Sequence, residues 1–159
     1  PRYEIPCRVH GEILVGDRRI EVDGWGQRDH SWGQARDWWA LGWNWTAGRL
    51  EDGTRWHSAG AFTGMDDLGV AYVLPAGSDT FEEHSSIHVD AQLGREGLIE
   101  RSTLGIGDLE LEVTPVAWSP VLLVHPDGRE ARFPRGLARV EARDGRSGVG
   151  WVEWNQPPI

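Results

Sequence analysis

The stretch SIHVDAQL, residues 86–93, alternates apolar and polar side chains along its whole length. Its apolar members share one side of an extended chain: Ile87, Val89, Ala91 and Leu93. Alternation at period two is typical of a strand with one face against a core and the other toward solvent. This stretch therefore predicts a half-buried β-strand.

Runs of the same kind recur along the chain, and 21 Gly and 9 Pro residues separate them. No window sustains the 3.6-residue period of an amphipathic helix. Turn sequences between the runs predict hairpins, most clearly Gly16-Asp17 and Glu51-Asp52-Gly53. The expected strands are residues 3–15, 18–25, 38–49, 54–63, 70–74, 86–93, 98–104, 109–118, 121–125, 131–133, 137–142 and 149–154.

These strands predict an all-β fold without crossover helices. We expect a closed or nearly closed antiparallel β-barrel of about 8–10 strands, because closure removes exposed sheet edges. A β-sandwich is the alternative architecture. The length of 159 residues suits one domain with a substantial core, so we expect residues 1–159 to form a single barrel domain.

The composition excludes several classes of protein. A net charge of −9, with no run of basic residues, argues against a nucleic-acid surface. Cys7 is the only cysteine, so no intramolecular disulfide framework forms, and a reducing cytoplasm is the expected location.

No apolar run approaches the ~20 residues of a membrane span. His84 and His88 lack the partners of a metal site, and we expect no metal and no cofactor.

Tryptophan is concentrated in the first third of the chain. Seven of the ten Trp residues lie at positions 25, 32, 38, 39, 43, 45 and 56. Period two places Trp39, Trp43 and Trp45 on one face of a strand. Either these side chains are ordinary core residues, or they line a cavity for an apolar ligand, which a small barrel can hold.

Charged and titratable side chains lie among these tryptophans, in the stretch GWGQRDHSWGQARDWW at residues 24–39. In a structural interpretation, Arg28 or Arg36 pairs with a neighbouring Asp and ties strands together. In a functional interpretation, Asp29 and His30 form an acid/base pair tuned by burial and by the nearby guanidinium. Adjacent strand residues point to opposite faces, so only a bulge at Gly26 or Gly33 would bring Asp29 and His30 into one cavity.

Two later residues extend this candidate site. His57 lies on the hairpin partner of the Trp-rich strand, where it is either a satisfied structural residue or faces the same space as the cluster. Glu153 lies on the last strand and alternates with Trp151. Since the last strand of a barrel closes against an early one, Glu153 is either a rim carboxylate or a partner for Arg28 or Arg36.

Two segments resemble a known family: residues 26–33, GQRDHSWG, and residues 148–155, GVGWVEWN. They are similar to segments of the AttH-like and carotenoid hydratase (hydroxyneurosporene synthase) group. The resemblance implies a lipocalin-like barrel that handles hydrophobic small molecules, with relatives that hydrate or cyclise terpenoids. The matching positions are Arg28, Asp29, His30, Trp32 and Gly33, with Trp151 and Glu153 at the end. Members of that group carry two such barrels in tandem, so we expect this chain to correspond to one, the C-terminal half.

Three functions are compatible with these features. The first is binding of a terpenoid, steroid or acyl ligand, with or without acid-catalysed hydration, dehydration or cyclisation. In that case Asp29, His30 and Glu153 are the candidate catalytic groups. The candidate ligand-binding residues are Arg28, Trp32, Arg36, Trp39, Trp43, Trp45, His57 and Trp151. The second function is a non-catalytic domain in which the Arg-Asp-His-Ser-Trp-Gly motif staples the barrel. The third is docking to a second barrel domain or a second copy of the chain through a Trp-rich surface.

Overall fold

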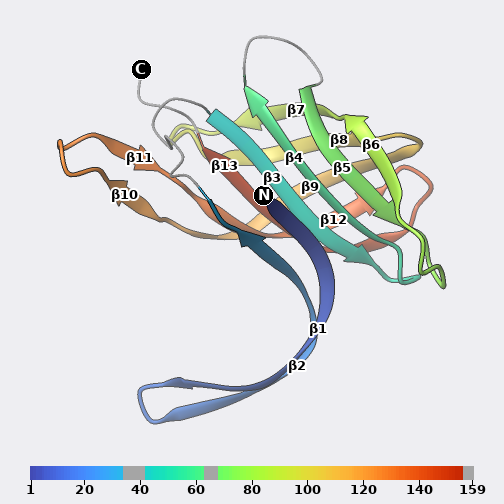
Figure 1. Cartoon of the computed structure of the whole chain (residues 1–159), viewed down its shortest axis with the longest axis horizontal. Helices are drawn as coiled ribbons and strands as arrows, with labels where there is room; N and C mark the ends of the chain where they lie inside the picture. Colours follow the sequence, from blue (N-terminus) through green and yellow to red (C-terminus); the bar gives the residue numbers. More distant parts are fainter. Residues whose placement is uncertain (34–41, 63–67, 156–159) are drawn as a thin grey trace. The chain divides into compact units, whose positions relative to one another are not determined.

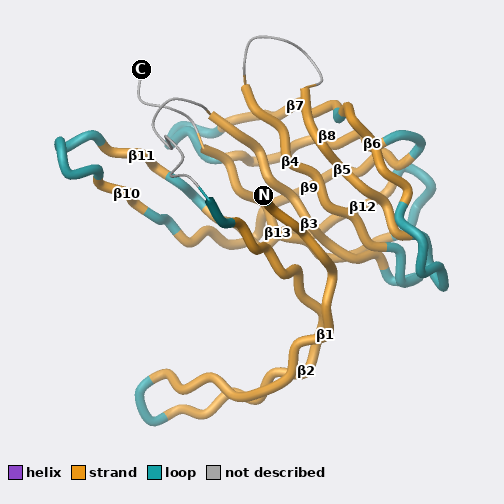
Figure 2. The backbone as a smooth tube through the Cα atoms, viewed as in Figure 1, coloured by secondary structure: helices purple, strands orange, loops and turns teal. Residues whose placement is uncertain are grey.

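The computed structural model describes residues 1–33, 42–62 and 68–155. Every regular element in this part of the chain is a β-strand, which confirms the predicted fold class (Figure 2). No helix of membrane-spanning length and apolarity occurs among the described residues. The chain divides into two compact units, Pro1–Ala35 and Arg36–Ile159.

The first unit is a two-stranded antiparallel ribbon formed by β1 (Arg2–Val15) and β2 (Arg18–Ser31) (Figure 1). The two strands pair along their whole length, from Arg2 opposite Ser31 to Val15 opposite Arg18. The turn at Gly16 requires φ of 58°, a left-handed conformation that glycine adopts without strain. The predicted hairpin is therefore confirmed, and its second strand continues to Ser31 instead of ending at Trp25.

The two faces of the ribbon differ in chemistry. Directly opposed residues share a face, so the register sorts the side chains. One face, called the apolar ribbon face, carries Tyr3, Ile5, Cys7, Val9, Ile13, Val15, Ile20, Val22 and His30, together with two arginines, Arg18 and Arg28. The other, called the charged ribbon face, carries Arg2, Glu4, Arg8, His10, Glu12, Arg19, Glu21, Asp23, Gln27 and Asp29, together with two apolar residues, Leu14 and Trp25. Cross-strand ion pairs on the charged face join Arg8 to Asp23 and Arg19 to Glu12.

The second unit is built on a nine-stranded antiparallel sheet in the order β6-β5-β4-β3-β13-β12-β9-β8-β7. Its strands are β3 (Gly42–Leu50), β4 (Arg55–Phe62), β5 (Leu68–Leu74), β6 (Glu82–Ser86), β7 (His88–Leu93), β8 (Ile99–Ile106), β9 (Leu109–Ser119), β12 (Arg135–Ala142) and β13 (Ser147–Asn155). Between β9 and β12 the chain forms a separate hairpin of β10 (Leu122–Val124) and β11 (Glu130–Arg132).

The topology explains how this sheet curls. Strands β3 to β6 form one meander and β7 to β9 another, and the C-terminal hairpin β12–β13 lies between them. The last strand pairs with β3, the earliest strand of the sheet, as expected for a barrel. The two end strands, β6 and β7, are separated in the chain by Ile87 alone, so the sheet must bend until its ends meet at that residue. Figure 1 shows the resulting half-barrel, which confirms the lipocalin-like architecture.

The core lies on one face of this sheet, called the core face. Its buried apolar side chains form one cluster, and they are Leu50, Trp56, Ala71, Val73, Ile87, Ile99, Leu104, Ile106, Leu109, Leu111, Val113, Ala138, Val140, Ala142, Val152 and Trp154. Trp56 packs across two neighbouring strands, where Gly48 is opposite Gly150. A Cβ on Gly48 would lie 2.4 Å from the Trp56 ring, so this contact requires glycine.

Two local expectations differ from the structure. Strand β6 was not expected, because Glu82–Ser86 carries no apolar alternation and its side chains are mostly exposed. Leu93, expected on the buried side of its strand, is 39% exposed at the end of β7, beside a register shift between Gln92 and Leu93.

Candidate functional site

Aromatic side chains follow one another across the face of the sheet opposite the core face. We call this set the aromatic row, and its members are Trp43, Trp45, His57, Tyr72, Phe81 and Phe133. Ring centroids are 5.1 Å apart for Trp45 and His57, 5.6 Å for His57 and Tyr72, and 4.8 Å for Tyr72 and Phe81. At the other end, the rings of Trp43 and Phe133 lie 5.1 Å apart.

Strand alternation places these rings. Thr46 is opposite Val152, a member of the core cluster, so Trp45 points to the other face. In the same way His57 lies between two residues directed to the core, Trp56 and Ser58. The sequence predicted that Trp43 and Trp45 share a face, and the structure places that face away from the core cluster.

His57 is the buried titratable group of the row. It is only 4% exposed, and its imidazole lies between the indole of Trp45 and the phenol ring of Tyr72. Aromatic faces attract cations, so these rings stabilise an imidazolium or another cation formed beside them. The site offers a proton-transfer group in an environment from which water is largely excluded.

Glu153 adds a carboxylate to the same face. It is opposite Trp45 on one side and Arg135 on the other, and its Oε1 lies 3.1 Å from Nε of Arg135. The Glu153 side chain is 12% exposed. The Arg135 guanidinium also lies 4.5 Å from the centre of the Phe133 ring. Glu153 and His57 are two strands apart, with β3 between them, which corresponds to about 10 Å across the sheet.

The Arg-Asp-His motif lies in the ribbon, where its side chains separate as alternation predicts. His30 stacks on Tyr3 at 5.5 Å and contacts Trp32 at 5.2 Å. The Arg28 guanidinium lies 5.6 Å from the Tyr3 ring. These contacts join β2 to β1 and give Arg28 and His30 a packing role within the hairpin.

Asp29 lies on the charged ribbon face, away from His30. Its Oδ2 is 3.2 Å from Nη2 of Arg2, and its side chain is 46% exposed. Arg2 also pairs with Glu4, which accepts a 3.5 Å hydrogen bond from Gln27. The ribbon therefore shows Asp29 in an ion-pair network and His30 in an aromatic stack, on opposite faces.

The remaining predicted site residues are distributed as follows. Trp151 is on the face of the aromatic row, opposite Ala47, and is 37% exposed. Arg36 and Trp39 lie outside the described residues. Within the described ranges, no group of three or more His, Cys, Asp or Glu side chains is arranged to hold a metal ion.

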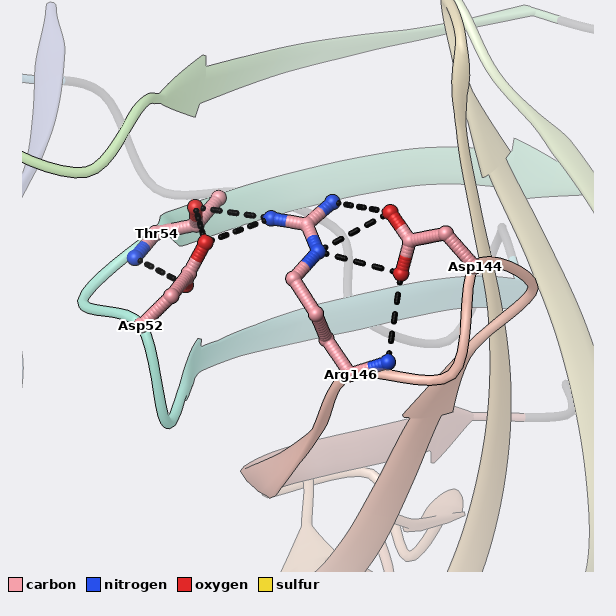
Figure 3. A network of polar contacts seen from close by, with 4 residues as sticks. All are labelled: Asp52, Thr54, Asp144 and Arg146. Carbon is pink, nitrogen blue, oxygen red and sulfur yellow. Dashed lines mark hydrogen bonds and ion pairs between the residues drawn. The ribbon is translucent and has the colours of Figure 1, made fainter.

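A second polar network joins two turns at one end of the sheet (Figure 3). Arg146, after the β12–β13 turn, donates hydrogen bonds to Asp144, and its Nη1 lies 2.7 Å from Asp52 and 3.0 Å from Thr54 in the β3–β4 turn. Asp52 also accepts hydrogen bonds from the amide and hydroxyl of Thr54. These four residues, called the turn clasp, connect two exposed turns and have a structural role.

Sequence reasoning missed four members of this site: Tyr72, Phe81, Phe133 and Arg135. Strand register places two of them, since Tyr72 is opposite His57 and Arg135 is opposite Glu153, whereas Phe81 and Phe133 lie in loops next to strands. The only sequence signal for them is their position on predicted strands or adjacent loops. A sequence prediction that paired β4 with β5 in the observed register would have placed Tyr72 beside His57.

The model of a domain of unknown function, DUF7064, matches residues 1–158. The chain belongs to this family. No curated protein sequence matches it significantly.

Two solved structures share the fold of this DUF7064 domain. One is a candidate AttH protein of Nitrosomonas europaea, with TM-score 0.71 and 16% identity, over 99% of this chain and 53% of that one. The other is kievitone hydratase of Nectria haematococca, with TM-score 0.62 and 14% identity, over 97% of this chain and 52% of that one. The AttH-like resemblance is thus confirmed for the fold. The DUF7064 chain spans about half the length of these relatives.

Proposed function

We propose that this domain binds a lipophilic small molecule along the aromatic row and promotes acid-catalysed addition or removal of water. One observation carries the proposal: buried His57 and nearly buried Glu153 occupy the same aromatic face of the sheet, on either side of Trp45. Indole and phenol rings provide broad apolar contact, and the two titratable groups provide proton transfer. The fold shared with a hydratase supports this reaction class by analogy.

The chemistry assigns a different role to each group. Hydration of an alkene begins when an acid gives a proton to one alkene carbon and leaves a carbocation on the other. The His57 imidazolium donates this proton, and the faces of Trp45 and Tyr72 stabilise the cation. A water oxygen then bonds to the cationic carbon, and Glu153, which pairs with Arg135, accepts the released proton. Return of this proton to His57 through solvent restores both groups. The sum is alkene plus water giving alcohol, and dehydration is the reverse.

A substrate panel tests this proposal. The purified chain is incubated with isoprenoid alkenes and alcohols in isotope-labelled water, and incorporation of the labelled oxygen is followed by mass spectrometry. We expect His57→Gln to lower kcat by about 100-fold or more, as loss of a general acid does, with a smaller change in KM. The matched control is His88→Gln, an exposed strand histidine, which should keep wild-type kcat.

Two results contradict the proposal. One is an absence of turnover across the panel together with an absence of binding. The other is turnover that survives His57→Gln and Glu153→Gln unchanged in folded variants.

A second candidate function, an interaction module, is favoured by the apolar ribbon face. Ile13 and Val15 on this face are 53% and 59% exposed. Exposed apolar surface of this extent marks protein contact sites. In this alternative the Arg28 and His30 contacts staple the ribbon, and a second barrel domain or a second copy of the chain covers its apolar face.

A further inference from the structure

Two arginines lie directly opposite each other on the face of the sheet that carries the aromatic row. Arg49 on β3 is opposite Arg55 on β4. Two residues further along the same strands, Ala47 is opposite His57, so the arginines share the face of His57. Both arginines are half-buried. We call them the arginine pair.

The strand register makes this juxtaposition close. Directly opposed Cα atoms of antiparallel strands are about 4.5–5.5 Å apart, and like charges in such positions destabilise a sheet. The residues beyond the pair are apolar, since Val149 is opposite Arg49 and Leu74 is opposite Arg55. The strand pairing therefore concentrates positive charge at one place in a chain whose net charge is −9.

The loop after β5 borders the arginine pair. Nη2 of Arg49 and Cβ of Ala76 lie 3.7 Å and 4.0 Å from the point where a Cβ on Gly53 would stand. The same loop carries Phe81, whose ring centroid is 4.8 Å from that of Tyr72 in the aromatic row. One loop thus lies beside both the arginine pair and the aromatic row.

The chemistry of the arginine pair suits an anion. Guanidinium groups bind carboxylate and phosphate through paired, charge-assisted hydrogen bonds. Residues two apart on a strand are separated by about 7 Å, so these positive charges lie near His57. The proposed proton transfer requires an imidazolium at His57, which neighbouring guanidinium groups oppose by repulsion. An anion bound to the arginine pair compensates for this repulsion.

We propose that the ligand of the aromatic row is a lipophilic anion, whose carboxylate or phosphate group binds Arg49 and Arg55 while its hydrocarbon lies along the aromatic rings. This inference rests on the proposed function, because it names the class of molecule that binds at the same site. A neutral lipophile makes the aromatic contacts alone and binds more weakly.

Three probes with the same branched hydrocarbon chain and a single alkene test this inference: citronellol, citronellate and citronellyl phosphate. Their dissociation constants for the full chain are measured by isothermal titration calorimetry. We expect both anions to bind at least tenfold more tightly than citronellol, and this difference to shrink when NaCl is raised from about 0.05 M to about 0.5 M. The more tightly bound anion identifies the preferred head group.

Substitutions of the arginine pair separate its contribution from that of the aromatic rings. Arg49→Gln and Arg55→Gln should each weaken citronellate binding about fivefold or more and change citronellol binding less than twofold. The matched control is Arg139→Gln, an exposed arginine on the same face, separated from Arg49 by Val149 of β13. It should change neither affinity by more than twofold. If Arg55→Gln does not fold, Arg49→Gln carries the test, and Arg55→Lys, which keeps the charge, must retain the preference for citronellate.

Two results overturn the inference: equal affinity for citronellol and citronellate, or a preference for citronellate that survives both Arg→Gln substitutions. These results are distinguishable from failure of the proposed function. If citronellol is hydrated and His57→Gln stops the reaction, while citronellate binds no better, only the anion site is wrong. If citronellate binds through the arginine pair but no probe is hydrated, the anion site stands and the hydration chemistry is wrong.

Discussion

At the scale of single residues, the turn clasp shows how exposed side chains acquire altered acidity. Hydrogen bonds from the Arg146 side chain and then from its backbone amide lower the pKa of Asp144. Partial burial acts to raise the pKa of Asp52, but hydrogen bonds from the Thr54 amide, Arg146 and the Thr54 hydroxyl together lower it. The two carboxylates in turn raise the pKa of Arg146.

A pH dependence follows from these shifts. Because the folded state lowers the pKa of Asp52 and Asp144 below the ordinary value of 3.8, their contribution to stability is complete above that value. It is lost as pH falls through the lowered pKa values, where the folded state must take up protons. We expect Arg146→Gln to flatten the fall in Tm between pH 5 and pH 2, measured by circular dichroism. Identical slopes in variant and wild type would contradict this role.

At the residue scale, the sequence predicted the local turn but not the long-range contact that the turn makes. The turn at Glu51-Asp52-Gly53 was predicted from its residue types, and Gly53 adopts φ of 100°, as a glycine turn position allows. The contact of Asp52 with Arg146 joins residues 94 positions apart. It exists only because β13 pairs with β3, and no local signal in either turn indicates that pairing.

At the scale of elements, the two faces of the ribbon β1–β2 differ in chemistry. An isolated two-stranded hairpin is marginal in water, and here one face carries mostly apolar side chains. Cross-strand pairs join Arg8 to Asp23 and Arg19 to Glu12 on the charged face, whereas the exposed apolar side chains of the other face gain by being covered.

Two neighbouring residues near the turn test this difference between the faces. Ile13 on the apolar ribbon face and Leu14 on the charged ribbon face are 53% and 67% exposed. We expect Ile13→Glu to reduce binding of a hydrophobic dye, or self-association in sedimentation velocity, by severalfold. Leu14→Glu, which adds the same charge at a more exposed position, should leave both near wild type. Equal effects of the two substitutions would show that the apolar ribbon face is not a distinct surface.

Strands were predicted correctly from the sequence where their own residues alternate apolar and polar side chains or flank a clear turn. The alternation in residues 86–93 predicted β7 and the buried Ile87, and the Gly16-Asp17 turn predicted the ribbon. The strand β6 was not predicted, because residues Glu82–Ser86 form a strand only by pairing with the edge of β5. The strand propensity of these residues does not indicate that a neighbouring edge is present.

At the scale of the whole molecule, the sheet order controls which residues can act together. Alternation predicted that Asp29 and His30 diverge, and the ribbon places them on opposite faces. Glu153 and His57 lie on one face of the sheet, two strands apart, because β13, β3 and β4 are consecutive in it. The sequence contained both residues as candidates. Sequence alone did not indicate that His57 and Glu153 share a face, because this depends on strand order. Strand order in turn rests on pairings between residues more than 100 positions apart, such as Glu153 with Trp45.

The central claim is that the aromatic row is a binding surface for a lipophilic molecule, and ¹⁹F NMR of the full chain labelled with 5-fluorotryptophan tests it most directly. Signals of Trp43 and Trp45 are assigned by Trp→Phe substitution and followed during titration with an isoprenoid alkene. The account predicts saturable shifts of both signals, with Trp118, which packs against the core cluster, unchanged. Trp43 and Trp45 signals that stay fixed while the ligand binds elsewhere, or while nothing binds, would contradict it.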